Sequence, residues 1–329
     1  MHRHGVAVLG TGSYVPDQVL TNDDLARMVD TTDEWIRTRT GISERHVAPP
    51  EEPTSVMACR AGERALEAAG VDPREIDLIV VATLSPDRPF PNTACFVQSM
   101  LGASKAACFS LEAACSGFIY GLEVAANLVR GGNYRKALVI GAEKVTMYVD
   151  WEDRATCVLF GDGAGAIVLG QVEPERDCLL AASLGADGTY TDLLYVAAGG
   201  SRMPVTHEAL DNKGTTIRMA GREVFKLAVN AMVGAGEGVL REAGVTIDQV
   251  RWLVPHQANQ RIISAVGERL GIPAERVVVN LDRYGNTSAA SIPIALDETV
   301  RAGKVDRGDL VLLVAFGGGL TWGAALLRW

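Results

Sequence analysis

The sequence has 329 residues, of which 48% are hydrophobic, so it can build one large domain or two ordinary ones, while its longest apolar runs are too short to cross a membrane. A formal net charge of -9 at pH 7, no long basic run and only 6% aromatic residues exclude nucleic acid as an expected partner. The six cysteines lack metal-binding spacing and the apolar run at the start is too short for a signal peptide, so we expect a reducing cytoplasm and no membrane partner.

In the first half of the chain, short β-prone runs alternate with runs of helical spacing. In order, we expect a strand at residues 5–10, helices at 22–29 and 54–70, a strand at 76–84, a helix at 92–101, a strand leading into Cys115, a helix to residue 130, and a strand at 136–141. Thr54 or Ser55 is the expected cap of the second helix. This alternation is typical of parallel strands joined by crossover helices.

The second half repeats this design at a constant offset of 171 positions. The offset carries Ile76-Asp77 onto Ile247-Asp248, Cys115 onto Asn286, Arg130 onto Arg301, and Gly132 onto Gly303. The expected elements are strands at 250–254, 276–280, 309–316 and 321–328, and helices at 260–270 and 287–300. We therefore expect an α/β chain with two duplicated halves, residues 1–171 and 172–329, packed together.

Two segments between these patterns need a separate interpretation. The Gly-rich run at 161–166 does not fit a dinucleotide fingerprint, because it leads into an expected strand at 167–170 and does not open a helix, so we expect a tight turn. Residues 185–212 are the most loop-like part of the chain, and we expect them to cover part of a pocket or a partner interface.

Cys115 is the first candidate for chemistry, since residues 106–121 change there from a β-prone run to helical spacing. A thiol at such a turn faces free backbone N–H groups and the positive end of a helix, which would lower its pKa from about 8.5 to about 3.5–7.5. That environment favours a nucleophile. The alternative is an inert core thiol, because cysteine is among the most buried residue types.

His256 and Asn286 follow the carboxyl ends of expected strands in the second half, as Cys115 does in the first. In open α/β sheets, ligands bind at the carboxyl ends of the strands. Cysteine with histidine forms a nucleophile pair, and an imidazole beside an amide offers two donors to a developing oxyanion. The glycines at 317–319 allow close backbone approach, so the N–H of Gly318 could pair with that of Cys115 as an oxyanion hole. Taken singly, the histidine fits an ordinary loop, the asparagine a helix cap, and the glycines a β turn.

Four stretches together resemble the signature blocks of β-ketoacyl-acyl carrier protein synthase III, the initiating enzyme of bacterial type II fatty acid synthesis in the thiolase superfamily. They are residues 111–118 (LEAACSGF), 254–259 (VPHQAN), 284–291 (YGNTSAAS) and 316–319 (FGGG), and the similarity runs from Val6 to the C-terminus. The third residue of the Cys-His-Asn set is Asn286, which separates the chain from elongating synthases. The lack of a cysteine beyond Cys178 separates it from thiolases. The resemblance implies a thiolase-like fold whose two βαβαβ halves pack as five layers, α-β-α-β-α.

The same resemblance implies a reaction that needs neither a metal nor an organic cofactor. Cys115 would take a short acyl group from acyl-CoA, with acetyl-CoA the expected donor. His256 and Asn286 would bind the thioester carbonyl of malonyl-acyl carrier protein, so that decarboxylation gives an enolate that attacks the acyl-cysteine. The products are 3-oxoacyl-acyl carrier protein, CoA and CO2, and Phe225 would favour loss of the malonyl carboxylate.

The resemblance also implies binding residues, each of which could instead be an ordinary core or surface residue. Those for CoA are Trp35 against the adenine, with Arg154 on its other side, Arg39 near the phosphates, and Asn259 in the pantetheine tunnel. Lys226 and Arg261, with Arg269, would receive the acidic carrier protein, although Glu268 interrupts this patch. The family is a homodimer with a continuous ten-strand sheet, and Phe90 would close the acyl pocket of the other subunit.

Other functions remain as alternatives at this point. One is an acyl-CoA-dependent acyltransferase that passes the acyl group to a hydroxyl or amine, and another is a specialised-pathway ketosynthase on the same fold. A cysteine hydrolase is disfavoured because no carboxylate obviously orients His256, and a non-enzymatic scaffold because the Cys-His-Asn set is intact. The primer acyl group can be acetyl, branched or longer.

Overall fold

The computed structural model describes residues 4–329, and two sheets form its framework. The five-stranded sheet, in the order β1-β7-β6-β4-β5, consists of β1 (Gly5–Tyr14), β7 (Asp162–Val172), β6 (Lys136–Lys144), β4 (Leu78–Ala82) and β5 (Ala107–Leu111). The four-stranded sheet, in the order β11-β12-β13-β8, consists of β11 (Val250–Pro255), β12 (Leu310–Gly317), β13 (Thr321–Arg328) and β8 (Leu179–Ala186). Two small ribbons pair β2 (Val19–Thr21) with β3 (Glu44–His46) and β9 (Leu194–Val196) with β10 (Ile217–Met219).

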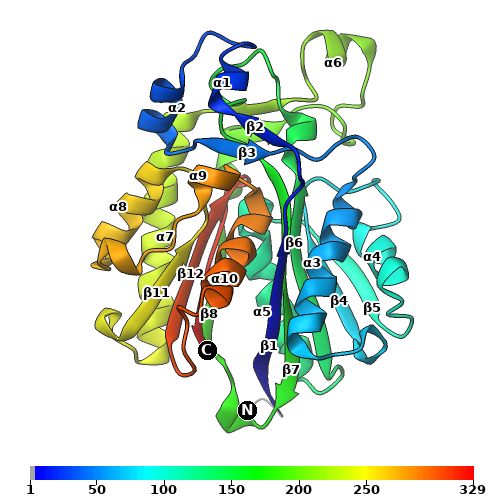
Figure 1. Cartoon of the computed structure of the whole chain (residues 1–329), viewed down its shortest axis with the longest axis vertical. Coiled ribbons are helices and arrows are strands. Elements are labelled where there is room, and N and C mark those ends of the chain that lie inside the picture. Colours follow the sequence, from blue (N-terminus) through cyan, green and yellow to red (C-terminus); the bar gives the residue numbers. More distant parts are fainter. Residues whose placement is uncertain (1–3) are drawn as a thin grey trace.

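Helices cover both outer faces of the sheets and fill the space between them (Figure 1). On the first sheet lie α3 (Thr54–Ala69) and α4 (Thr93–Leu101), between the sheets α5 (Gly117–Arg130) and α10 (Ser291–Arg301), and on the second sheet α7 (Gly221–Ala243) and α8 (Gln260–Leu270). The short helices are α1 (Asn22–Leu25), α2 (Asp33–Thr40), α6 (His207–Asp211) and α9 (Leu281–Tyr284). The expected five-layer α-β-α-β-α arrangement is confirmed.

The side-chain pattern of β4 explains why the sheet is covered on both faces. All five residues of this strand are buried. Leu78 and Val80 belong to the core between the sheets, whereas Ile79 and Val81 belong to the core under α3 and α4. Because successive side chains of a strand point to opposite faces, a continuous apolar run needs a helix layer on each side.

The Gly-rich run is part of a strand, which corrects the expected turn. β7 already begins at Asp162 and pairs with β6 from Lys144↔Asp162 onward. The glycines serve close packing: a Cβ on Gly165 would lie 2.6 Å from the backbone nitrogen of Ile294, at the start of α10. Glycine therefore lets α10 lie directly against the strand.

The expected strand at 276–280 is also wrong. This segment begins with a 3-10 turn at Ala274–Arg276 and makes one isolated bridge, between Val277 and Leu253 of β11. Beyond it, the side-chain amide of Gln257 donates to the carbonyl of Val278 at 3.0 Å and accepts the N–H of Asn280 at 3.0 Å. The Gln257 side chain thus forms hydrogen bonds that a neighbouring strand would form in a β ladder. The second sheet therefore has four strands.

Helix ends differ from the expected ones by a few residues. The first helix is only Asn22–Leu25, and α3 is preceded by Pro53, with no side-chain cap from Thr54 or Ser55. The helix expected from 287 begins as a 3-10 turn at Ser288–Ala290 before α10. Within residues 4–329, no helix is both long and apolar enough to span a bilayer.

Candidate active site

The candidate nucleophile and its two candidate partners lie on three separate segments that meet in the interior of the molecule. Cys115 is in a 3-10 turn between β5 and α5, His256 follows β11 directly, and Asn286 lies between α9 and α10. All three line one cavity of about 120 Å³, together with Phe225 of α7 and Asn259 at the start of α8. The structure therefore brings the sequence-derived set to one place.

Cys115 also borders a second cavity of about 480 Å³. The two cavities share Cys115, Phe160 and Leu194, so these residues separate them. The second cavity is lined largely by apolar side chains from the segment 191–199 and from the ends of β4 and β6. The thiol is thus placed between two cavities, one that contains His256 and Asn286 and one that does not.

The backbone around the thiol is held in close contact with the end of β12. Ala114 has φ 45°, in the left-handed region that side chains other than glycine rarely adopt. A Cβ on Gly317 would lie 2.5 Å from the backbone nitrogen of Cys115. Gly318 and Gly319 line the second cavity next to the thiol. Glycine at 317 is required by this close approach.

The electrostatic expectation for Cys115 is wrong. Burial raises the pKa of its thiol to about 12, and a side-chain hydrogen bond with Ser288 only partly opposes this effect. Burial likewise lowers the pKa of His256 to about 3. Desolvation is the largest cause of both shifts, because both side chains are almost fully enclosed. The resting pair is therefore a neutral thiol and a neutral imidazole.

Hydrogen bonds fix the orientation of His256 and Asn286. The Nδ1 of His256 lies 2.7 Å from the hydroxyl oxygen of Ser291, which leaves Nε2 for the cavity. Since a hydroxyl can donate or accept, Ser291 suits either tautomer of the imidazole. The Oδ1 of Asn286 accepts the N–H of Ser288 at 2.9 Å, which leaves the amide N–H groups for a ligand.

Sequence reasoning missed three polar residues of this region: Glu143, Ser288 and Ser291. Glu143 was visible as a charged residue at the carboxyl end of an apolar strand, on the same edge as Cys115. Ser288 and Ser291 stand inside the quoted block 284–291, but their partners come from β6 and from the end of β11. Only the folded chain reveals these contacts.

The residues expected to bind CoA lie together on α2 and its neighbours. The guanidinium carbons of Arg39 and Arg154 lie 4.8 Å and 4.9 Å from the ring centroid of Trp35. The amide of Asn259 donates to the carbonyl of Arg39 at 3.1 Å and so links this cluster to the cavity. Phe225, 37% exposed, also lines the cavity. A planar ring beside two cations suits an aromatic, anionic ligand.

Two surfaces concern the expected partners. Lys226 of α7 and Arg261 of α8 are exposed, and Arg269 donates to the Oδ1 of Asn230 at 2.6 Å.

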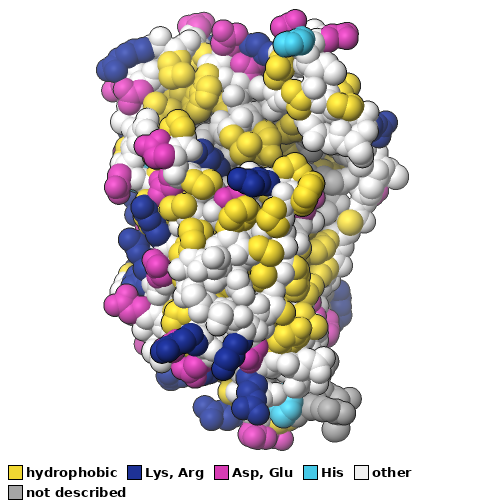
Figure 2. Space-filling model, turned by 90° about the vertical axis from the view of Figure 1, so that its right-hand side faces the viewer, with side chains coloured by type: hydrophobic (Ala, Val, Ile, Leu, Met, Phe, Trp, Pro, Cys, Tyr) yellow, Lys and Arg dark blue, Asp and Glu magenta, His cyan; other side chains and the backbone are white. Residues whose placement is uncertain are grey.

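The second surface surrounds Phe90, whose side chain is 84% exposed. The side that carries α4 and β5 presents many hydrophobic side chains (Figure 2). Because β5 is at the edge of its sheet, one row of its backbone groups has no strand beside it within residues 4–329.

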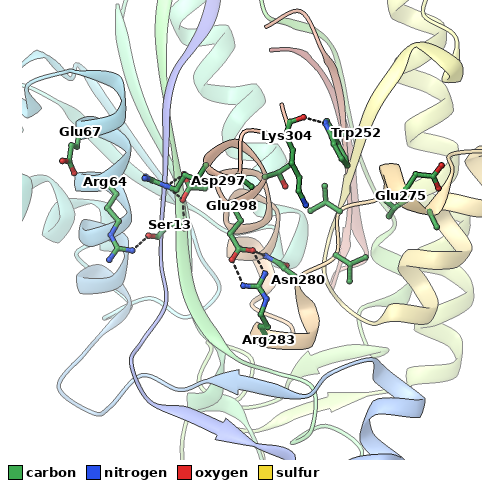
Figure 3. A pocket seen from close by; sticks show the side chains of 17 residues that line it. Ser13, Arg64, Glu67, Trp252, Glu275, Asn280, Arg283, Asp297, Glu298 and Lys304 are labelled. Carbon is green, nitrogen blue, oxygen red and sulfur yellow. Dashed lines mark hydrogen bonds and ion pairs between the residues drawn. The ribbon is translucent and has the colours of Figure 1, made fainter. Parts of the chain in front are cut away.

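A larger hollow lies elsewhere, in a groove of about 980 Å³ beside α3, α10 and β11 (Figure 3). Several of its charged groups already have partners: Arg283 pairs with Glu298 at 2.9 Å, and the carboxylate of Asp297 accepts from the Ser13 hydroxyl at 2.6 Å. No cysteine or histidine lines this groove. We therefore place the chemistry at Cys115.

A buried cysteine, a neutral histidine and an asparagine at the edge of a five-layer α-β-α-β-α fold define a condensing enzyme of the thiolase fold. The family description "3-Oxoacyl-[acyl-carrier-protein (ACP)] synthase III" matches residues 109–188, and its C-terminal counterpart matches residues 240–329. The chain belongs to the β-ketoacyl-acyl carrier protein synthase III family, the condensing acyltransferases that initiate fatty acid synthesis.

The similarity extends along the whole chain. Beta-ketoacyl-[acyl-carrier-protein] synthase III of Desulfitobacterium hafniense strain Y51 is 56% identical over 324 residues, 98% of each chain. The protein of the same name from Caldanaerobacter subterraneus is 54% identical over 322 residues, which are 98% of this chain and 97% of that one. The crystal structure of 3-oxoacyl-[acyl-carrier-protein] synthase III from Aquifex aeolicus superposes with a TM-score of 0.91 at 51% identity, covering 99% of this chain and 100% of the other.

Proposed function

We propose that this chain transfers a short acyl group from acyl-CoA to Cys115 and condenses it with malonyl-acyl carrier protein. The observation that carries the proposal is the position of the thiol between two cavities. One cavity presents His256 and Asn286 to an incoming thioester, and the other has room for the acyl group that the thiol receives.

In the first half-reaction, Cys115 attacks the thioester carbon as the thiol proton passes to water. The backbone N–H groups of Cys115 and Gly318 hold the oxyanion of the tetrahedral intermediate. The C–S bond to CoA then breaks, and CoA leaves as a thiol with a proton taken from water.

In the second half-reaction, the malonyl thioester lies in the His256 cavity with its carbonyl oxygen between the imidazole and the Asn286 amide. Both donors favour the enolate that forms when the C–C bond to the carboxylate breaks and CO2 leaves. Phe225 makes the surroundings of the carboxylate apolar. The enolate carbon attacks the acyl-cysteine, 3-oxoacyl-acyl carrier protein leaves, and the thiolate takes a proton from solvent. No metal or organic cofactor takes part.

The binding roles follow from the positions of the side chains. Trp35 stacks on the CoA adenine, Arg39 and Arg154 pair with the phosphates and the ring, and Asn259 contacts the pantetheine arm. The exposed cations Lys226 and Arg261 receive the acidic carrier protein close to the mouth of the passage, which their neighbours Phe225 and Ile262 line.

The chain acts as a cytoplasmic homodimer. The open edge of β5 supports pairing with a second copy, which would extend the first sheet to ten strands and cover the hydrophobic face around Phe90. In that dimer, Phe90 of each subunit closes the acyl pocket of the other. Six free cysteines agree with a reducing compartment.

The test is to follow each half-reaction separately. Acyl-CoA thioesters of increasing length are incubated with the purified protein, and intact mass with peptide mapping reports the adduct on Cys115. Cys115→Ala abolishes the adduct, whereas His256→Ala and Asn286→Ala still form it but lose decarboxylation of malonyl-acyl carrier protein. Equal loss of both half-reactions in all three variants would refute this division of roles. Acyl transfer without decarboxylation would instead indicate an acyltransferase.

A further inference from the structure

A buried carboxylate that the mechanism above does not use lies behind the nucleophile. Glu143, at the carboxyl end of β6, has no exposed surface. Four donors point at it: the hydroxyls of Thr83 at 3.1 Å, Ser85 at 2.6 Å and Ser288 at 3.0 Å, and the N–H of Leu84 at 3.2 Å. Burial raises the pKa of Glu143 to about 7, and its hydrogen bonds with Ser85 and Ser288 act against this rise.

Ser288 joins this carboxylate to one residue of the reaction. Its hydroxyl donates to Glu143 at 3.0 Å, and its backbone N–H donates to the Oδ1 of Asn286 at 2.9 Å. Ser288 has φ 49°, a left-handed backbone conformation that residues other than glycine rarely adopt. Such a conformation persists only where neighbouring contacts hold it.

We propose that Glu143 is a positioning residue that acts through Ser288 to orient the Asn286 amide. This inference rests on the proposed condensing reaction and deepens it. The carboxylate holds the Ser288 hydroxyl, and this contact keeps the serine N–H directed at the Oδ1 of Asn286. With Oδ1 engaged, the amide presents its N–H groups to the thioester oxygen. A flipped amide would present its carbonyl and repel the enolate.

The chain supplies a matched control in Asp162, a buried carboxylate on the neighbouring strand β7. It accepts the N–H groups of Ala48 at 2.8 Å and Thr146 at 3.0 Å and the Thr146 hydroxyl at 2.6 Å. None of these donors lines either cavity at Cys115. Asp162→Asn therefore removes a buried carboxylate of similar surroundings without touching Ser288.

The experiment compares Glu143→Gln, Asp162→Asn and Ser288→Ala in the full-length protein. For each variant, acetyl-CoA loading of Cys115 and decarboxylation of malonyl-acyl carrier protein are measured, with kcat and KM for the second step. Because a misplacement of about 1 Å can cost about 100-fold, we expect Glu143→Gln to lower kcat for decarboxylation roughly 10- to 100-fold. The KM for the malonyl substrate and the kinetics of Asp162→Asn stay within about two-fold of wild type.

A double variant tests the route through Ser288. If Glu143 acts through this serine, Glu143→Gln adds no more than about two-fold to the effect of Ser288→Ala. Equal effects of Glu143→Gln and Asp162→Asn, or full additivity with Ser288→Ala, would overturn the inference. Should Glu143→Gln fail to fold, unchanged decarboxylation by Ser288→Ala would overturn it instead. A wild-type protein that does not decarboxylate would refute the proposed function itself.

Discussion

Replacing Gly317 by alanine should disable the first half-reaction through a single methyl group. The new Cβ would lie 2.5 Å from the backbone nitrogen of Cys115 and 3.0 Å from the Cβ of Ala114, whereas ordinary contacts begin near 3.4 Å. The overlap with the nitrogen is therefore about 1 Å. Gly317 pairs with Thr321 of β13 and its φ is negative, so the effect comes from this contact and not from the alanine backbone.

Either way of relieving this overlap damages the site. If the turn around Cys115 moves by about 1 Å, the thiol is misplaced, which can cost about 100-fold in rate. If the 317–318 segment moves instead, the N–H of Gly318 leaves the oxyanion, and losing one such donor costs about 100- to 1,000-fold. We therefore expect acylation to slow by at least about 100-fold. The accompanying overpacking costs about 1–3 kcal/mol of stability.

The assay is a quenched time course of acetyl-CoA loading, read by intact mass, beside thermal unfolding. Gly234→Ala is the control, since Gly234 is exposed on α7 and a Cβ there meets no atom within 4 Å. This control should acylate normally and gain about 0.5–1 kcal/mol of stability, because alanine favours a helix. A Gly317→Ala protein that is folded and loads within about three-fold of wild type would refute the steric argument.

Three further predictions concern pH, CoA and the carrier protein. Because burial lowers the pKa of His256 to about 3, the unfolded chain binds a proton between about pH 6.5 and 3 that the folded chain does not. The free energy of unfolding therefore falls as the pH falls through this window, by about 2 kcal/mol between pH 7 and pH 5. Urea unfolding of His256→Asn should show a pH dependence that is smaller by this amount. Trp35→Ala should raise the KM for acyl-CoA about ten-fold with little change in decarboxylation, and Trp35→Phe should raise it less; an unchanged KM would exclude stacking. Charge reversal at Lys226 and Arg261 should raise the KM for malonyl-acyl carrier protein and weaken its salt dependence, whereas Arg251→Glu on β11 should do neither.

The elements with clear periodicity were predictable from the sequence. β4, α5 and β12 lie where apolar runs and helical spacing indicate them. The offset of 171 positions carries α5, at 117–130, onto 288–301, which the 3-10 turn and α10 occupy together. Such segments are predictable because local spacing alone decides which face is buried.

The parts that depend on distant contacts were not predictable. The single bridge at Val277 depends on the Gln257 side chain, and the strand conformation of the Gly-rich run depends on close packing with α10. Ser288 meets Glu143 across 145 positions of sequence. The raised pKa of Cys115 follows from burial by several segments at once, so a turn motif in the sequence could not give even its direction.

The two cavities that meet at Cys115 determine which ligands compete for the same binding space. Under the proposed function, acyl-CoA, departing CoA and malonyl-acyl carrier protein all use the passage lined by His256, while the acyl group waits in the other chamber. Free CoA therefore competes with the malonyl substrate for an acylated enzyme. Accumulated CoA should slow the second step even when every thiol is loaded, which ties the rate of chain initiation to the balance between free and acylated CoA.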